Sequence, residues 1–132
     1  MKRSCLILIF LTRSFSVAGA SELDNMLTGY RDAGAAGFSA ERGKLLWTKS
    51  HTIDGEQRAC SSCHTADPAA RGKHVKTGKP IEPIAVSANP ERFTDMAKTE
   101  KWLRRNCKWT LGRECTPQEK GDLLTWLGGQ EE

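Results

Sequence analysis

Five consecutive residues in the chain carry the clearest chemical signal, Cys60-Ser61-Ser62-Cys63-His64. Two thiols at this spacing can each add to one vinyl group on the same edge of a porphyrin, and C-x-x-C-H is the signature at which a c-type haem is attached. The imidazole that follows can then bind the iron from one face. We therefore expect Cys60 and Cys63 to hold one covalent haem c, with His64 as the proximal ligand of the iron.

The same cysteine pair has two alternative interpretations. Half of a zinc site would need further ligands, and the other cysteines outside residues 1–20, Cys107 and Cys115, lack the paired spacing of a zinc knuckle. A redox dithiol of the thioredoxin kind belongs to a βαβ frame, and no strand pattern surrounds this motif. Both alternatives fit the surrounding sequence less well than haem attachment does.

The first twenty residues have the layout of a secretory signal peptide. Lys2 and Arg3 give a basic start, residues 5–11 are apolar, and Ala18-Gly19-Ala20 is a small-residue cleavage site. The apolar run is far shorter than the roughly 20 residues that span a bilayer. We expect cleavage after Ala20 and a single mature monohaem domain, residues 21–132, in the periplasm and without membrane insertion.

The positive charge of the chain comes largely from this leader. Removal of residues 1–20 takes away three basic residues and no acidic one, which lowers the formal net charge from +4 to +1. A nearly neutral mature domain gives no indication of nucleic-acid binding. Export would also place Cys107 and Cys115 in an oxidising compartment, where a disulfide is their expected state.

Two helices are predicted before the haem motif. Ser21 caps the first, and an apolar stripe follows at helical spacing: Leu23, Met26, Leu27 and Tyr30. Ser39 opens a second helix that runs to about residue 48. Gly43 and Trp47 share one face of it, where the glycine allows another helix to approach closely. Residues 50–59 are predicted to be a polar loop that leads into the motif.

Two further helices are predicted after the motif. Residues 65–93 show no sustained period, and an irregular segment of this length is expected to wrap around a bound group. A third helix is expected at about 95–106, with Thr94 as its cap. The last helix opens with a capping box formed by Thr116 and Glu119. Its apolar stripe is Leu123, Leu124, Trp126 and Leu127.

This order of elements resembles the class I cytochrome c arrangement. In that arrangement the first and last helices cross at a glycine and an aromatic residue, here Gly43 with Trp47 and Trp126. The resemblance implies an all-α fold around one covalently attached haem whose edge is exposed.

The second axial position of the iron would decide the function. A strong ligand such as Met or His suits electron transfer, whereas a weak or absent ligand leaves the iron open to small molecules such as O₂ or NO. The mature chain offers Met26 and Met96, and also His51 and His74, which we expect to be exposed. Met96 is the ordinary choice for a simple electron carrier. The residues alone do not distinguish this alternative from an open site.

Several stretches are similar to the sphaeroides haem protein (SHP) family of high-spin, class I-type monohaem cytochromes c. The Arg-Asn-Cys element at 105–107 and its partner Cys115 are the specific part of the likeness. The other parts are Glu41 to Gly43, Thr77 to Lys79, Arg92 to Asp95, Glu100 to Arg104 and Gly112 to Lys120. The likeness covers most of the mature chain.

The resemblance implies that Asn106 is a weak sixth ligand beside a Cys107–Cys115 disulfide. It further implies that the amide leaves on reduction, that ferrous iron then binds O₂ or NO, and that electrons come from a partner such as a dihaem cytochrome c or a membrane cytochrome b. An amide oxygen is a hard, neutral ligand, so its bond to ferrous iron should be weak. A related group that resembles cytochrome c″ has histidine at this position. No residue is assigned a catalytic role.

Overall fold

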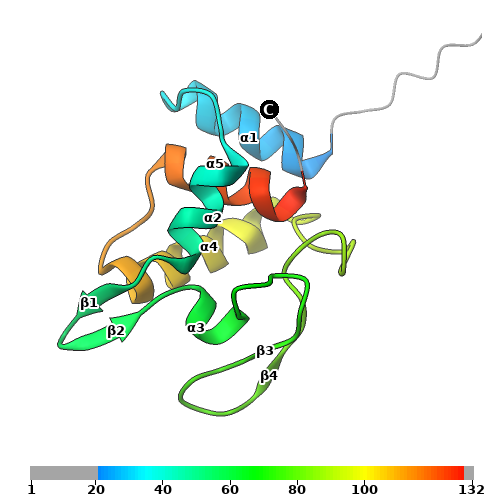
Figure 1. Cartoon of the computed structure of the whole chain (residues 1–132). Helices are drawn as coiled ribbons and strands as arrows, with labels where there is room; N and C mark the ends of the chain where they lie inside the picture. Colours follow the sequence, from blue (N-terminus) through cyan, green and yellow to red (C-terminus); the bar gives the residue numbers. More distant parts are fainter. Residues whose placement is uncertain (1–20, 130–132) are drawn as a thin grey trace, which may run out of the picture.

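The computed structural model describes residues 21–129 (Figure 1), so the predicted signal peptide lies outside the described residues. The elements are α1 Glu22–Asp32, α2 Ala40–Thr48, β1 His51–Ile53, β2 Glu56–Arg58, α3 Ser61–His64, β3 Gly72–Lys73, β4 Pro80–Ile81, α4 Met96–Leu111 and α5 Pro117–Gly128. Within this range the strands form two short antiparallel pairs, β1 with β2 and β3 with β4. The fold is all-α, as expected. No helix in residues 21–129 is long and apolar enough to cross a membrane.

Capping boxes open the first and the last helix. The hydroxyl of Ser21 accepts the amide N–H of Asp24, and the Asp24 carboxylate accepts the Ser21 amide in return. Thr116 and Glu119 make the same reciprocal pair at the start of α5. Each box satisfies two backbone donors that a helix start leaves unpaired. The predicted starts of both helices are confirmed.

The crossing of α2 over α5 holds these two helices in close contact (Figure 1). A Cβ atom on Gly43 would lie 2.2 Å from the carbonyl oxygen of Asp122, so only glycine fits without displacing backbone. One turn further along α2, the ring of Trp47 meets the edge of the Trp126 ring, with centroids 5.5 Å apart. The predicted crossing of an early and a late helix at a glycine and an aromatic pair is therefore confirmed.

We expect Gly43→Ala to lower the free energy of unfolding by about 1–3 kcal/mol, the usual cost of overpacking. Thermal denaturation of the purified protein measures this. Gly29→Ala is the matched control, because nothing lies within 4 Å of the position of its Cβ in α1. Alanine in a helix interior is more favourable than glycine by roughly 0.5–1 kcal/mol. Equal destabilisation by the two variants would contradict the tight crossing.

Two apolar clusters fill the interior. The first lies between α1 and α5 and contains Leu23, Met26, Leu27, Tyr30, Phe38 and Leu124. The second surrounds Trp47 and contains Cys107, Cys115, Leu123 and Leu127. Phe93 and Leu103 are half-buried and pack against both clusters. The chain before α4 and the middle of α4 are thereby joined to the rest of the fold.

The predicted loop at residues 50–59 is wrong. This segment is a hairpin in which His51 pairs with Arg58 and Ile53 with Glu56. Both turn residues, Asp54 and Gly55, have positive φ angles of 52° and 79°. Asp-Gly is a typical two-residue hairpin turn because both positions tolerate positive φ. The hairpin delivers the chain directly to Cys60.

The predicted boundaries of the third helix also need correction. Its cap is Asp95, whose carboxylate accepts the Lys98 amide at 2.9 Å, whereas the hydroxyl of Thr94 donates backwards to the carbonyl of Glu91. The helix ends only at Gly112, which adopts φ 70° and terminates it in the left-handed conformation. Asn106 therefore lies inside the helix and not at its end.

Candidate haem site

The residues of the C-x-x-C-H motif lie on one short helical turn, α3. The carbonyl of Cys60 accepts the amides of Cys63 at 3.3 Å and His64 at 3.2 Å. Residues at positions i, i+3 and i+4 share one face of a helix. The two thiols and the imidazole consequently line the same cavity.

Two neighbours fix this turn from behind. A Cβ atom on Gly72 would lie 2.2 Å from the carbonyl oxygen of Cys63, so β3 packs directly on the motif. The indole N–H of Trp47 donates to the carbonyl of Thr65 at 2.8 Å, and its ring lies 5.2 Å from the imidazole of His64 between centroids. Trp47 thus connects the helix crossing to the orientation of His64.

Helix α4 forms another wall of the cavity. Asn106 lines the cavity, as do Leu103 and Thr110 at helical spacing on either side of it. These positions place the Asn106 amide on the face that α4 turns toward the α3 motif. The structure therefore brings the four predicted haem-binding residues, Cys60, Cys63, His64 and Asn106, to one cavity.

Of the other candidate axial ligands, His74 lines the cavity, whereas Met26, Met96 and His51 do not. Met26 is buried in the first apolar cluster. Met96 is 40 % exposed and is absent from the described residues that line the cavity, as is His51. His74 does line the cavity, but its Nδ1 accepts the backbone amides of Lys76 and Thr77 at 3.2 Å each.

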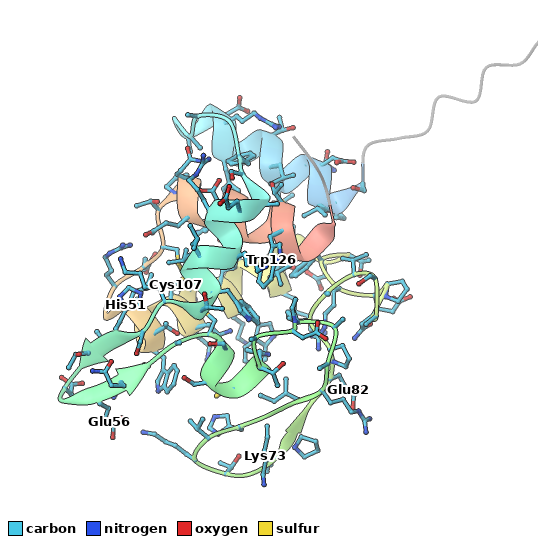
Figure 2. The ribbon with its side chains drawn as sticks, in the orientation of Figure 1. His51, Glu56, Lys73, Glu82, Cys107 and Trp126 are labelled. Carbon is cyan, nitrogen blue, oxygen red and sulfur yellow. A yellow bond between two sulfur atoms is a disulfide. The ribbon has the colours of Figure 1, made fainter. Side chains whose placement is uncertain are left out.

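The predicted disulfide is confirmed. Cys107 and Cys115 are joined, with their Cα atoms 5.5 Å apart, and both are buried. Figure 2 labels Cys107 on α4. Because Cys115 directly precedes the cap of α5, the bond ties the turn that carries Asn106 to the last helix. It also removes both sulfurs as ligands for the zinc alternative.

Comparison with known proteins gives a consistent result. The family model for a domain of unknown function, DUF1924, matches residues 33–127. The cytochrome c-type protein SHP of Cereibacter sphaeroides is 44 % identical over 126 residues, which is 95 % of this chain and 97 % of that protein. The chain belongs to the SHP family and to the family that the DUF1924 model describes.

Solved structures extend the likeness to the fold. Oxidised SHP, described as an oxygen-binding cytochrome c, aligns with a TM-score of 0.77 at 44 % identity and covers 85 % of this chain and 100 % of its own. Oxidised cytochrome c″ from Methylophilus methylotrophus aligns with a TM-score of 0.73 at 32 % identity, over 84 % and 96 % of the two chains. The class I cytochrome c-like fold is thus shown, and with it the cofactor of an SHP-family chain, one covalently attached haem.

The cavity has the size and lining that such a group requires. Its volume is about 730 Å³, within the range of pockets that bury a cofactor. Its walls are predominantly apolar and include Leu46, Trp47, Ile84, Phe93, Leu103 and Leu127. A flat macrocycle would cover this surface, while the polar groups of the α3 motif and Asn106 remain available to it. The residues present therefore fit a haem.

Burial shifts the pKa of two groups of the motif. The low-dielectric surroundings of His64 lower the pKa of its imidazole, and the positive charge of Arg92 lowers it further. Burial likewise raises the pKa of the Cys60 thiol, an effect that a hydrogen bond from Thr110 partly offsets. A neutral imidazole offers the lone pair that a metal ligand must have.

Sequence reasoning missed three residues that shape the site. Trp47 was recognised as a packing residue, but its contacts with the motif depend on the fold. Thr110 lies one helical turn beyond Asn106 and is only 2 % exposed. Its position on the cavity face follows from the helix period once α4 is known to continue past residue 106. Arg92 carried no signal of its own beyond the family likeness.

Replacement of both disulfide cysteines by alanine should lower the free energy of unfolding by roughly 2.5 kcal/mol, since the unfolded chain regains the entropy of the closed loop. Chemical denaturation under oxidising conditions measures the difference. When the bond of the wild-type protein is reduced, the two proteins should unfold at similar denaturant concentrations. A wild-type midpoint that does not respond to reduction would contradict this contribution.

Proposed function

We propose that the mature chain is a periplasmic monohaem cytochrome whose iron has one labile protein ligand, Asn106, and which binds a diatomic gas, O₂ or NO, in the reduced state. Covalent haem c supplies the redox-active iron and the site of gas binding. His64 would supply a permanent ligand to that iron, and Asn106 would supply a displaceable one.

Each residue of the site has a distinct role in this proposal. Cys60 and Cys63 hold the macrocycle by thioether bonds, so the cofactor cannot dissociate. His64 is the permanent ligand, and Trp47 restrains its ring. Asn106 is the displaceable ligand, because a neutral amide oxygen competes poorly for electron-rich ferrous iron.

The observation that carries the proposal is the placement of Asn106 on the cavity wall, next to a disulfide that fixes its helical turn. The alternative, an electron carrier with Met96 as sixth ligand, has less support because Met96 is the first residue of α4 and does not line the cavity. The descriptions of two relatives are in keeping with this proposal. SHP is described as oxygen-binding, and a solution study of cytochrome c″ is described as giving insight into detachment of a haem ligand.

The reduced state needs a source of electrons. The family likeness points to a partner such as a dihaem cytochrome c or a membrane cytochrome b. We place this encounter in the periplasm, because residues 1–20 read as a cleavable signal peptide. Redox turnover of the bound gas would be an extension of gas binding.

Optical spectroscopy tests the proposal on the purified holoprotein. The spectrum is recorded in the oxidised and reduced forms, with and without NO. We expect the reduced form to be high-spin and to change at once when NO is added. A low-spin, six-coordinate reduced spectrum that resists NO would contradict the proposal. A methionine–iron charge-transfer band in the oxidised form, lost in Met96→Leu, would support the electron-carrier alternative.

A further inference from the structure

A half-buried arginine faces the haem cavity without an acidic partner. Arg92 donates from Nε to the carbonyl of Pro83 at 2.8 Å and from Nη2 to the carbonyl of Glu82 at 3.0 Å. Both acceptors are neutral backbone groups. No ion pair of Arg92 with a carboxylate is found among residues 21–129, although Arg92 is one of the residues that line the cavity. The described hydrogen bonds of its guanidinium therefore go to neutral acceptors and to no carboxylate.

Arg92 lies four residues before the N-terminal end of α4, whereas Thr110 lies near the C-terminal end of that helix. Thr110, near the C-terminal end of α4, lies close enough to the Cys60 thiol to lower its pKa. Lys98, twelve residues earlier on the same helix, also lines the cavity, and this separation is about 18 Å at 1.5 Å per residue. Arg92 precedes the N-terminal end of α4. In Figure 1 the chain that leads into α4 and the β1–β2 hairpin that leads to Cys60 lie on opposite sides of the molecule.

The local backbone holds Arg92 rigidly. Phe93, the next residue, has φ 62°, a conformation that costs a non-glycine residue of order 1–3 kcal/mol. Phe93 packs against both apolar clusters, which fixes this turn. The carbonyl of Pro83 accepts a second bond from Asn89 at 3.4 Å, so the acceptor side is also restrained. The guanidinium is thus preorganised at the cavity rim.

A guanidinium has five N–H donors, and two of those of Arg92 are used by the backbone bonds. The remaining donors form the planar fork that matches a carboxylate. A haem carries two carboxylates of its own, the propionates, and they project from a different edge of the ring than the vinyl groups. If Cys60 and Cys63 hold the vinyl edge, the propionates extend away from the thiols, toward the end of the cavity at which Arg92 lies.

Other charges at this end do not replace Arg92. Glu91 and Asp95 also line the cavity, but like charges do not attract a propionate, and the Asp95 carboxylate already caps α4. Lys98 is an exposed cation on a flexible chain, with no described bond from its ammonium group to hold it in place. Arg105 also lines the cavity, but its guanidinium lies over the Trp102 ring at 5.0 Å. Arg92 is instead held by two hydrogen bonds to backbone carbonyls.

We infer that Arg92 is a further cofactor-binding residue, which pairs with a haem propionate and through that pair favours the reduced iron. The inference rests on the proposed haem attachment at Cys60, Cys63 and His64. A cation beside a propionate offsets the negative charge that otherwise stabilises the ferric state. Loss of the pair should therefore make the iron harder to reduce.

The test uses the holoprotein with Arg92→Gln. We expect the equilibrium constant for one-electron reduction to fall roughly tenfold, about 59 mV in reduction potential, as measured by spectroelectrochemical titration. Resonance Raman spectra should show a shifted propionate bending band, because this band follows hydrogen bonding to the carboxylate. An arginine that served only to join loops would leave the band in place. If Arg92→Gln folds poorly, Arg92→Lys is the second variant. It keeps the positive charge, so its reduction potential should stay close to that of the wild type.

Arg104→Gln is the matched control, since it removes an exposed cation of α4 that does not line the cavity. We expect less than a twofold change in the same equilibrium constant and an unshifted band. A propionate band that stays at the wild-type frequency in Arg92→Gln would overturn the inference, whatever the potential does. A wild-type protein without covalent haem, detected by its mass, would instead overturn the proposed function and the inference together.

Discussion

Replacement of Asn106 by alanine is expected to open the ferric protein to NO. The amide competes with an added ligand for the same position on the iron, so the apparent affinity is reduced by the fraction of molecules in which the position is free. If the position is free in about 1 % of the wild-type molecules, removal of the amide raises the ferric affinity for NO roughly 100-fold. Equilibrium titration of the oxidised variant with NO, followed by absorbance, measures this change.

The reduced state provides an internal comparison. Once the iron is ferrous, the wild-type amide should already have left, so wild type and Asn106→Ala should bind NO alike. Asn25→Ala makes the same chemical change on the exposed face of α1 and should leave both states unaffected. A ferric Asn106→Ala protein that is as closed to NO as the wild type would show that another group holds the position.

Replacement of Cys60 and Cys63 together by serine is expected to abolish covalent attachment of the haem. Serine hydroxyls do not form the thioether bonds that the vinyl groups require, so extraction with acidified organic solvent should leave an unmodified polypeptide mass. The wild-type chain should retain one haem under the same treatment. Ser61→Ala changes the intervening sequence of the same turn and should retain its haem fully.

The double variant should also have a much lower free energy of unfolding than the removal of two thiol groups alone would cause. Helix α4 has sixteen residues but buries only Thr99, Cys107 and Thr110 through the described protein contacts. Trp102 on the same helix is 48 % exposed and lines the cavity. A covalently held macrocycle would therefore supply much of the apolar surface on which α4 packs. Persistence of covalent haem in the double serine variant would contradict the assignment of the two thiols.

The sequence predicted the parts of the fold that local chemistry decides. The capping boxes at Ser21 and Thr116 are complete within four residues, so both helix starts could be placed. The hairpin at residues 51–58 was missed although Asp54-Gly55 is a recognisable turn pair, because its strands are too short to show alternation. The third helix was predicted to end at Asn106, whereas the helix continues to the left-handed Gly112.

The site was predictable to the extent that it follows from spacing. Cys60, Cys63 and His64 share a face because they lie on one helical turn. The placement of Asn106 on the same cavity depends on how α4 crosses the motif, and only the family likeness indicated it. The contact of Trp47 with His64 and the orientation of Arg92 join residues that are far apart in sequence. Such contacts are set by tertiary packing and leave no local pattern.

Crystallography of the oxidised holoprotein tests the central claim most directly, because it identifies the atom on the iron opposite His64. We predict the side-chain oxygen of Asn106 in the oxidised crystal and its withdrawal from the iron in the same crystal after reduction. A methionine sulfur or an imidazole nitrogen in that position, retained in both states, would contradict the account.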